Sequence, residues 1–377
     1  MSDPALHSSV PQISTRIATL TSIRGVAAWW VVLYHFRLEM PPFGGPLASD
    51  VLGHGYLAVD LFFILSGFVI ALNYTASFTS LTAKAYRRFL GLRLARVYPL
   101  HLVMMLLFLC NPLAIMLFSH HGDPGGRYDP VYYVLSLLLV QNWGFVSDTA
   151  WNVPAWSIST EWAAYLLFPL LAWGVAPRLR SAAGGLAVVA GALAVLVAGA
   201  ARAVPGLGAD IATFGLFRCL TEFAAGAGLF WAYQRRPATA SAGGGTMWLL
   251  AAAALVVAAV LLALPDFLLI PPAFALLIYG LSRQPRWADW LLGWRALELL
   301  GTVSYSTYLA HYFVRDWVKF LLVGPGKSAG TATVVYLAAT ALASVLLYRW
   351  IELPGRRVFR AVLAGPAYKA ALAPAEP

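Results

Sequence analysis

Arg24 and His35 lie in one apolar stretch, Leu20 to Arg37, which is long enough to cross a bilayer as a helix. Ionisable side chains are costly inside such a segment, so they are candidates for function. Their spacing of 11 residues corresponds to three helical turns plus about 20°, so both lie on one helix face, about 16 Å apart along the axis. A cation near one end of this face and an acid–base group near the other indicate a path for a substrate.

The composition is typical of a membrane protein with several spans. Of 377 residues, 60% are hydrophobic and only 11% are charged, against about 25% charged in soluble domains. We therefore predict an all-α polytopic membrane protein. The net charge of +10 does not indicate a nucleic-acid partner, because the basic residues are spread over short loops between apolar runs. Cys110 and Cys219 lie within apolar runs and show neither metal-site spacing nor a disulfide framework, and we expect no metal.

Ten apolar runs have about the length of a transmembrane helix, and an eleventh, 131–146, is shorter. The loop 77–98 contains five basic residues and no acidic one, which predicts a cytoplasmic position. Alternation then gives ten spans with both termini inside, provided that 131–146 is re-entrant or interfacial. The ten runs are 17–38, 56–76, 97–118, 157–176, 182–200, 212–233, 247–264, 267–282, 297–321 and 330–350.

This topology divides the chain into three parts. Residues 1–16 are predicted to be a cytoplasmic arm, and residues 17–355 a membrane domain. Residues 356–377 are predicted to be a basic, Ala/Pro-rich cytoplasmic tail.

At the outer end, the topology brings four ionisable residues to comparable depth: His35, Asp60, Glu161 and His311. A carboxylate beside an imidazole fixes its tautomer and raises its basicity, which activation of a hydroxyl group requires. Each residue also has a structural alternative. Asp60 at a helix end would face water, and His311 would be a hydrogen-bonded packing residue.

The inner end has a different chemistry. Arg93 and Arg96 are three residues apart, just ahead of Pro99, which suits the first turn of a helix. With Lys84, Arg87 and Arg88 they form a cationic patch, and guanidinium groups match phosphate oxygens. The patch indicates a phosphorylated cytosolic ligand; the alternative is a topology signal and lipid anchor. Ser66 and Gly67 are a further pair of small residues whose alternative role is close helix packing.

Six segments carry a resemblance to a known family. In chain order they are Ser22–Ala27 with His35, Asp60–Phe68, Arg93–Pro99, Trp156–Glu161, Gly301–His311 and Tyr348–Pro354. Together they resemble the motifs of the acyltransferase 3 family of integral membrane proteins, whose members O-acylate exported glycans, envelope polymers and some natural products.

The resemblance implies a cytosolic acyl-CoA donor, most often acetyl-CoA, and a carbohydrate or other hydroxyl acceptor outside a bacterial inner membrane. His35 becomes the candidate general base, with Glu161 and Asp60 in support. Arg24, Arg93, Arg96 and Arg88 become candidates for binding the donor. Candidates for contacting substrate are Ser66, Tyr305, His311 and Trp156.

Several questions stay open at this level. Direct transfer to the hydroxyl is the preferred mechanism, with a covalent acyl-His or acyl-Ser intermediate as the alternative. The rival class of function is a proton-coupled transporter or flippase of an anionic or lipid-linked glycan, in which the same residues relay protons. Larger relatives in this family carry a second, extracytoplasmic domain after the last span, whereas here only about 25 residues follow that span. We therefore expect the membrane domain to complete the reaction alone or with a separate partner. The sequence leaves the oligomeric state and the acceptor open.

Overall fold

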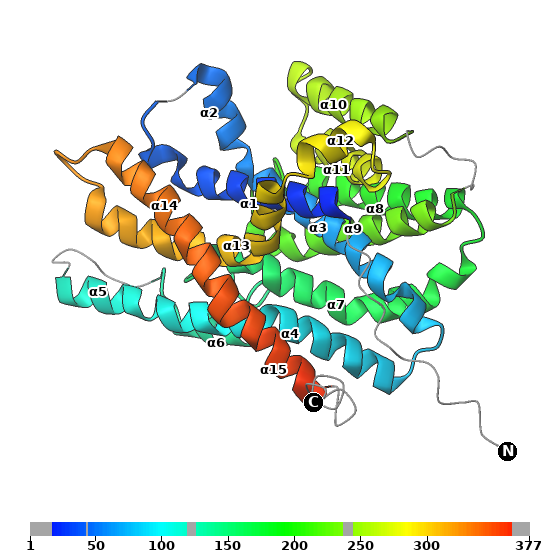
Figure 1. Cartoon of the computed structure of the whole chain (residues 1–377), viewed down its shortest axis with the longest axis horizontal. Helices are drawn as coiled ribbons and strands as arrows, with labels where there is room; N and C mark the ends of the chain where they lie inside the picture. The colour runs from blue at the N-terminus through cyan, green and yellow to red at the C-terminus, as the bar shows by residue number, and fades with distance from the viewer. Residues whose placement is uncertain (1–16, 43, 119–125, 237–243, 364–377) are drawn as a thin grey trace, which may run out of the picture.

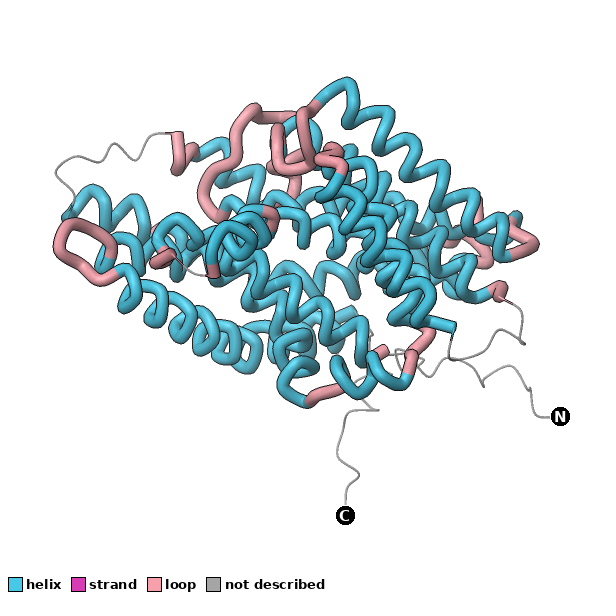
Figure 2. The backbone as a smooth tube through the Cα atoms, turned by 90° about the horizontal axis from the view of Figure 1, so that it is seen from above, coloured by secondary structure: helices cyan, strands magenta, loops and turns pink. Residues whose placement is uncertain are grey.

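The computed structural model describes residues 17–42, 44–118, 126–236 and 244–363, and all the regular structure in these ranges is helical (Figure 2). The predicted arm 1–16 lies outside the described residues. The longer helices run roughly side by side, with α4 and α5 along one edge and α10, α11 and α12 along the opposite one (Figure 1). The helices are α1 Ala18–Phe36, α2 Gly45–Gly53, α3 Ala58–Tyr74, α4 Ala83–Phe108, α5 Cys110–Phe118, α6 Pro130–Leu137, α7 Trp156–Gly174, α8 Ala182–Ala203, α9 Ile211–Gln234, α10 Gly245–Leu261, α11 Asp266–Ser282, α12 Arg286–Leu292, α13 Arg295–Leu322, α14 Ala329–Leu347 and α15 Leu353–Leu363, with short 3-10 turns at Arg37–Glu39, Gly55–Leu57, Thr75–Phe78, Val153–Ala155 and Ala176–Arg178 and a π-helical turn, η7, at Tyr348–Glu352.

Each of the ten predicted apolar runs contains a helix. Five described helical stretches are long and apolar enough to cross a membrane, and a sixth counts if α11 and α12, bent by 99°, form one span. Helices α1, α9 and α13 have 19, 24 and 28 residues, which is also long enough, but they carry ionisable residues. The count of ten spans therefore stays a prediction.

The short run 131–146 contains only α6, an eight-residue helix of about 12 Å, followed by irregular backbone. A helix of this length cannot cross a hydrocarbon core of about 30 Å. This agrees with the expectation that the segment does not span.

Helix α4 begins earlier than the apolar pattern predicted. It starts at Ala83, where the Thr82 hydroxyl accepts a hydrogen bond from the backbone N–H of Ala85 at 3.2 Å. Arg93 and Arg96 therefore lie inside a helix and not in a loop. The expectation that Pro99 lies in a first helical turn was wrong, because Pro99 lies in the interior of α4.

Helices α1 and α13 run parallel in close contact. Arg24 contacts Gly301 near one end, and His35 contacts His311 near the other. The crossing depends on glycine, because a Cβ atom on Gly25 would lie 2.5 Å from the backbone nitrogen of Gly301. This packing sets the register of the two helices and so determines which side chains face one another.

Helices α3 and α9 cross in the same way at Gly67 and Gly226. A Cβ on either glycine would collide with the backbone of the other helix, at Phe223 or Ile64. Gly67 thus has the packing role that the sequence offered as an alternative, whereas its neighbour Ser66 faces a cavity described below.

Helix α15 continues beyond residue 355, the predicted end of the membrane domain, to Leu363. After α14, η7 and α15 carry the chain across α4 (Figure 1), where Gly355 packs against Pro99. Residues 356–363, predicted as the start of a tail, are the last turns of α15, and residues 364–377 lie outside the described residues.

Candidate functional site

A cavity of about 170 Å³ opens between α1, α3, α4, α7 and α13. Three of its lining side chains are arginines, Arg24, Arg93 and Arg96, and we call it the arginine cavity. It brings six of the predicted site residues together. Its polar lining consists of these arginines with Ser66, Ser157, Glu161, Tyr165, Ser304, Tyr305 and Tyr308.

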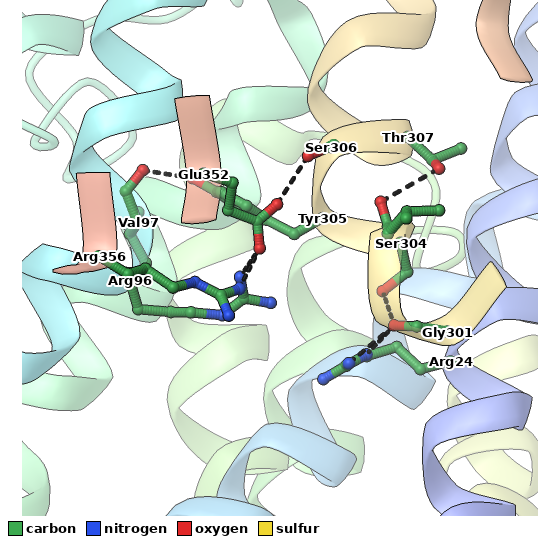
Figure 3. Close-up of polar contacts among 11 residues, drawn as sticks. Arg24, Arg96, Val97, Gly301, Ser304, Tyr305, Ser306, Thr307, Glu352 and Arg356 are labelled. Atoms are coloured by element: carbon green, nitrogen blue, oxygen red, sulfur yellow. Dashed lines mark hydrogen bonds and ion pairs between the residues drawn. The ribbon is translucent and has the colours of Figure 1, made fainter. Parts of the chain in front are cut away.

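Each arginine is held by contacts with another element of the structure. Arg24 donates from Nη2 to the carbonyl oxygen of Gly301 at 2.8 Å (Figure 3), and Arg93 donates to the Tyr74 hydroxyl at 2.6 Å. The Arg96 guanidinium lies over the ring of Tyr305, 5.2 Å from its centroid. These contacts fix three cations around one space, which suits a ligand with several phosphate oxygens.

Arg96 is also tied to the end of the chain through Glu352, which is only 1% exposed. One carboxylate oxygen of Glu352 accepts from both Arg96 and Arg356, and the other accepts from the Ser306 hydroxyl at 2.6 Å (Figure 3). Glu352 lies in η7, where the wider π-helical turn joins α14 to α15. Glu352 lies in Tyr348–Pro354, one of the six segments that carry the family resemblance, but the sequence predicted no role for it.

Glu161 belongs to the arginine cavity and does not lie beside His35. Its Oε1 atom accepts from the Ser66 hydroxyl and, at 2.5 Å, from the Tyr165 hydroxyl. The prediction by depth had grouped Glu161 with His35, but helix α7 presents it toward α3 and α4.

His35 and His311 form the second part of the site. The Nε2 atom of His311 lies 3.2 Å from Nδ1 of His35, and the ring centroids are 5.0 Å apart. His311 is fully buried, whereas His35 is half-buried. Both histidines were predicted to lie at similar depth, and in the structure they are in contact.

The surrounding carbonyl groups determine which ring nitrogen of each histidine carries a proton. His311 Nδ1 lies 3.3 Å from the carbonyl oxygen of Thr307, which can only accept, so this nitrogen carries the proton. Neutral His311 then offers the lone pair of Nε2 to His35. His35 Nδ1, which also lies 3.0 Å from the Val31 carbonyl oxygen, is therefore the protonated nitrogen. The lone pair of His35 is left on Nε2, as a general base requires.

Tyr308 connects the arginine cavity to the histidine pair. It lines the cavity, and its ring centroid lies 5.9 Å from that of His311. Its hydroxyl is 2.9 Å from that of Ser157 and donates to the carbonyl oxygen of Pro154 at 3.1 Å. The cavity thus ends within one side chain of the histidines.

Asp60 does not orient His35. Its two oxygens accept from Nε and Nη2 of Arg218 at 2.6 and 2.5 Å, in a pair that is 2% exposed at the arginine and fully buried at the aspartate. The alternative of a solvent-facing helix end is wrong as well. Arg218 and its neighbour Glu222 on α9 were missed by the sequence analysis, although ionisable residues in an apolar run are themselves a signal.

Two further predicted residues do not reach the cavity. Trp156 packs beneath Arg218, whose guanidinium carbon is 5.8 Å from the centre of the tryptophan ring. Arg88 is exposed on the first turns of α4. Within the part of the chain that the structure describes, no group of three or more metal-ligating side chains comes together.

A family model described as an acyltransferase domain matches residues 17–349 of this chain. The chain belongs to this acyltransferase family. The matched region contains both histidines and every residue that lines the arginine cavity. Glu352, which holds Arg96, lies just beyond it. No solved structure matches the chain.

Three curated relatives extend the comparison. The chain is 36% identical to the acyltransferase MdmB of Streptomyces mycarofaciens over 169 residues, which are 43% of this chain and 40% of the relative. It is 24% identical to YrhL of Bacillus subtilis, provisionally named a peptidoglycan O-acetyltransferase, over 90% of this chain and 55% of YrhL. Protein 2 of the picA locus of Rhizobium radiobacter is 33% identical over 48% of this chain and 95% of its own length. The chain thus spans about half the length of the first two relatives.

Proposed function

We propose that this chain is a membrane O-acyltransferase that moves an acyl group, most simply acetyl, from acyl-CoA to a hydroxyl of an exported glycan or envelope polymer. The observation that carries the proposal is the arginine cavity, which leads along α13 from Arg24 at Gly301 to Tyr308, next to the His311–His35 pair. It brings an anion-binding space to within one side chain, Tyr308, of an acid–base pair.

The donor end is the arginine cavity. Arg93 and Arg96, with Arg24, bind the phosphate groups and the phosphopantetheine region of the donor. Between Arg24 and His35 the helix rises about 16 Å, a span suited to the extended arm of the donor. The thioester then lies beside Tyr308 and Phe62, whose rings are 5.8 Å apart.

The acid–base end is His35. Its Nε2 atom takes the proton of the acceptor hydroxyl while the hydroxyl oxygen attacks the thioester carbonyl carbon. The tetrahedral intermediate collapses with cleavage of the carbon–sulfur bond, and the proton passes from His35 to the departing thiolate. Free CoA and the acylated acceptor result. His311 and the Val31 carbonyl oxygen together hold the tautomer that this step needs.

The proposed orientation follows the basic loops. Ten spans with both termini in the cytoplasm put the Arg24 end of the bundle inside and the His35 end outside. A cytosolic donor and an exported acceptor would then meet at His35. The residues of loop 77–98 that form the first turns of α4, with exposed Arg87 and Arg88, lie at the cytoplasmic side in this orientation.

The test uses the purified full chain in lipid nanodiscs with labelled acetyl-CoA. We expect saturable donor binding, and transfer to at least one of peptidoglycan fragments, lipopolysaccharide or capsular polysaccharide, read by mass spectrometry. His35→Ala should keep donor binding and lose about 10²–10⁴-fold in transfer, the usual contribution of a general base. Arg93→Ala with Arg96→Ala should weaken donor binding, whereas Arg87→Ala, on an exposed site of the same helix, should not.

Two results would contradict the proposal. A protein that does not bind acetyl-CoA but moves a lipid-linked glycan across the nanodisc or vesicle membrane would be a transporter. Full transfer activity in His35→Ala would remove the proposed base.

A further inference from the structure

A second pocket, of about 230 Å³, lies at the far end of α13, between that helix, α5 and the residues before α6. It shares no lining residue with the arginine cavity. We call it the Trp317 pocket. Its defining residues are Asn111, Arg127, Tyr128, Asp316, Trp317 and Phe320.

The polar groups of this pocket are fixed in place around Asp316. Its carboxylate accepts from Arg127 at 2.6 Å and from the Asn111 amide at 3.2 Å. The oxygen of the Asn111 amide accepts a hydrogen bond from the indole N–H of Trp317 at 3.0 Å. An interlocked set of planar hydrogen-bonding groups is pre-organised, so little side-chain entropy is lost when a ligand binds.

Aromatic rings form the walls beside these groups. Trp317 and Phe320 meet edge to face with centroids 6.3 Å apart, and Tyr128 is 8% exposed. The rim is open, because Phe320 is 45% exposed and the Arg127 side chain 47%. The volume is below the 300–1,000 Å³ of pockets for drug-sized ligands, so a single ring of a larger molecule suits it.

Two side chains, Arg315 and Tyr312, link the pocket to His35. Arg315, four residues after His311 on α13, lines the pocket and stacks on the Tyr312 ring at 4.7 Å. The Tyr312 ring meets His35 edge to face, with centroids 5.4 Å apart. A molecule held in the pocket is therefore separated from His35 only by the side chains of Arg315 and Tyr312.

We infer that the Trp317 pocket binds one sugar unit of the acceptor. Amide, carboxylate and guanidinium groups pair with sugar hydroxyls, and aromatic faces pack on the apolar face of a sugar ring. Aromatic and basic residues at the end of a membrane helix also serve as interface anchors. That role does not explain a 5% exposed Asn111 hydrogen-bonded between Asp316 and Trp317. The inference rests on the proposed function, because it assigns the acceptor of the same reaction.

The experiment is saturation-transfer difference NMR on the full chain in nanodiscs, with methyl glucoside, methyl N-acetylglucosaminide and methyl glucuronide as probes. At least one glycoside should give a saturable signal. Phe320→Ala should weaken its binding by about tenfold, the value of one good contact, and Asn111→Leu by at least as much. Phe320 is half exposed, so its variant keeps the test valid if Asn111→Leu fails to fold.

The matched control for these variants is Phe145→Ala, at a 65% exposed phenylalanine outside both pockets. It should bind the glycoside as the unmodified chain does. Binding that is unchanged in Phe320→Ala would overturn the inference. Saturable binding of glycerol 3-phosphate with none of the glycosides would overturn it too, because the pocket would then belong to a lipid headgroup.

Transfer from labelled acetyl-CoA, measured on the same preparations, separates this inference from the proposed function. Glycoside binding that depends on Phe320 without any acetyl transfer would keep the inference and overturn the function. Transfer to a glycan with an unchanged acceptor KM in Phe320→Ala and Asn111→Leu would keep the function and overturn the inference.

Discussion

His311 Nε2 lies 3.2 Å from His35 Nδ1, although 276 residues separate the two in the chain. The contact exists because α1 and α13 pack in parallel through Gly25 and Gly301. In the proposed mechanism the His311 imidazole takes the part that a carboxylate has in many catalytic pairs: it helps to fix a tautomer of His35 without adding a buried negative charge.

The His311 contact predicts a graded response to substitution. His311→Leu removes one of the two acceptors of His35 Nδ1–H, the other being the Val31 carbonyl oxygen, and should lower kcat about tenfold, the equivalent of one hydrogen bond. His311→Gln offers an amide oxygen and should recover much of the loss. Steady-state kinetics with acetyl-CoA would measure both. Equal losses in the two variants, at equal thermal stability, would mean that size and not hydrogen bonding matters at this position.

The Glu352 cluster predicts that the π-helical turn η7 controls donor binding. Glu352→Ala leaves Arg96 and Arg356 without their shared carboxylate, so Arg96 should lose its position and the KM for acyl-CoA should rise about tenfold. Arg356→Ala should raise the KM less, because Glu352 still holds Arg96. Arg357→Ala is the matched control at the adjacent, exposed position and should leave the KM unchanged. If Glu352→Ala lowers kcat and leaves the KM for acyl-CoA unchanged, then Glu352 acts in the chemical step and not in donor binding.

Much of the architecture could be predicted from the sequence because long apolar runs in a membrane must form helices. A backbone without water has to satisfy its hydrogen bonds within the segment, so each run contains a helix. Helix α4 shows the limit of this argument. Its first turns are basic and exposed, and a capping threonine rather than apolarity determines where it begins.

The site was predicted less completely, because topology gives the depth of a residue but not the direction it faces. Depth grouped Glu161 and Asp60 with His35, whereas Glu161 turns toward Ser66 and Asp60 toward Arg218. Those directions depend on helix rotation and on partners far along the chain. Of the four residues grouped by depth, only His35 and His311 also face each other in the structure.

The glycine crossing of α1 and α13 predicts a strong effect of small substitutions. A Cβ on Gly301 would collide with the backbone of Thr21, so Gly301→Ala must separate the helices or fail to fold. Overpacking of this kind costs about 1–3 kcal/mol, which should appear as a lower unfolding temperature in detergent. Gly191→Ala is the control, because nothing lies within 4 Å of a Cβ at that helical position. Equal stability of the two variants would contradict the close crossing.

The Asp60–Arg218 pair predicts that Asp60 acts through stability and not through catalysis. Arg218→Met leaves Asp60 and the fully buried Glu222 without a cation, and removal of one partner from a buried pair costs about 3–5 kcal/mol. Asp60→Asn should cost less, because Glu222, four residues after Arg218 on α9, remains to balance the charge. Thermal unfolding of the two variants in nanodiscs, beside kcat measured well below the unfolding temperature, separates the roles. If Asp60→Asn unfolds normally but loses most of its kcat, then Asp60 takes part in the reaction and the ion pair is secondary.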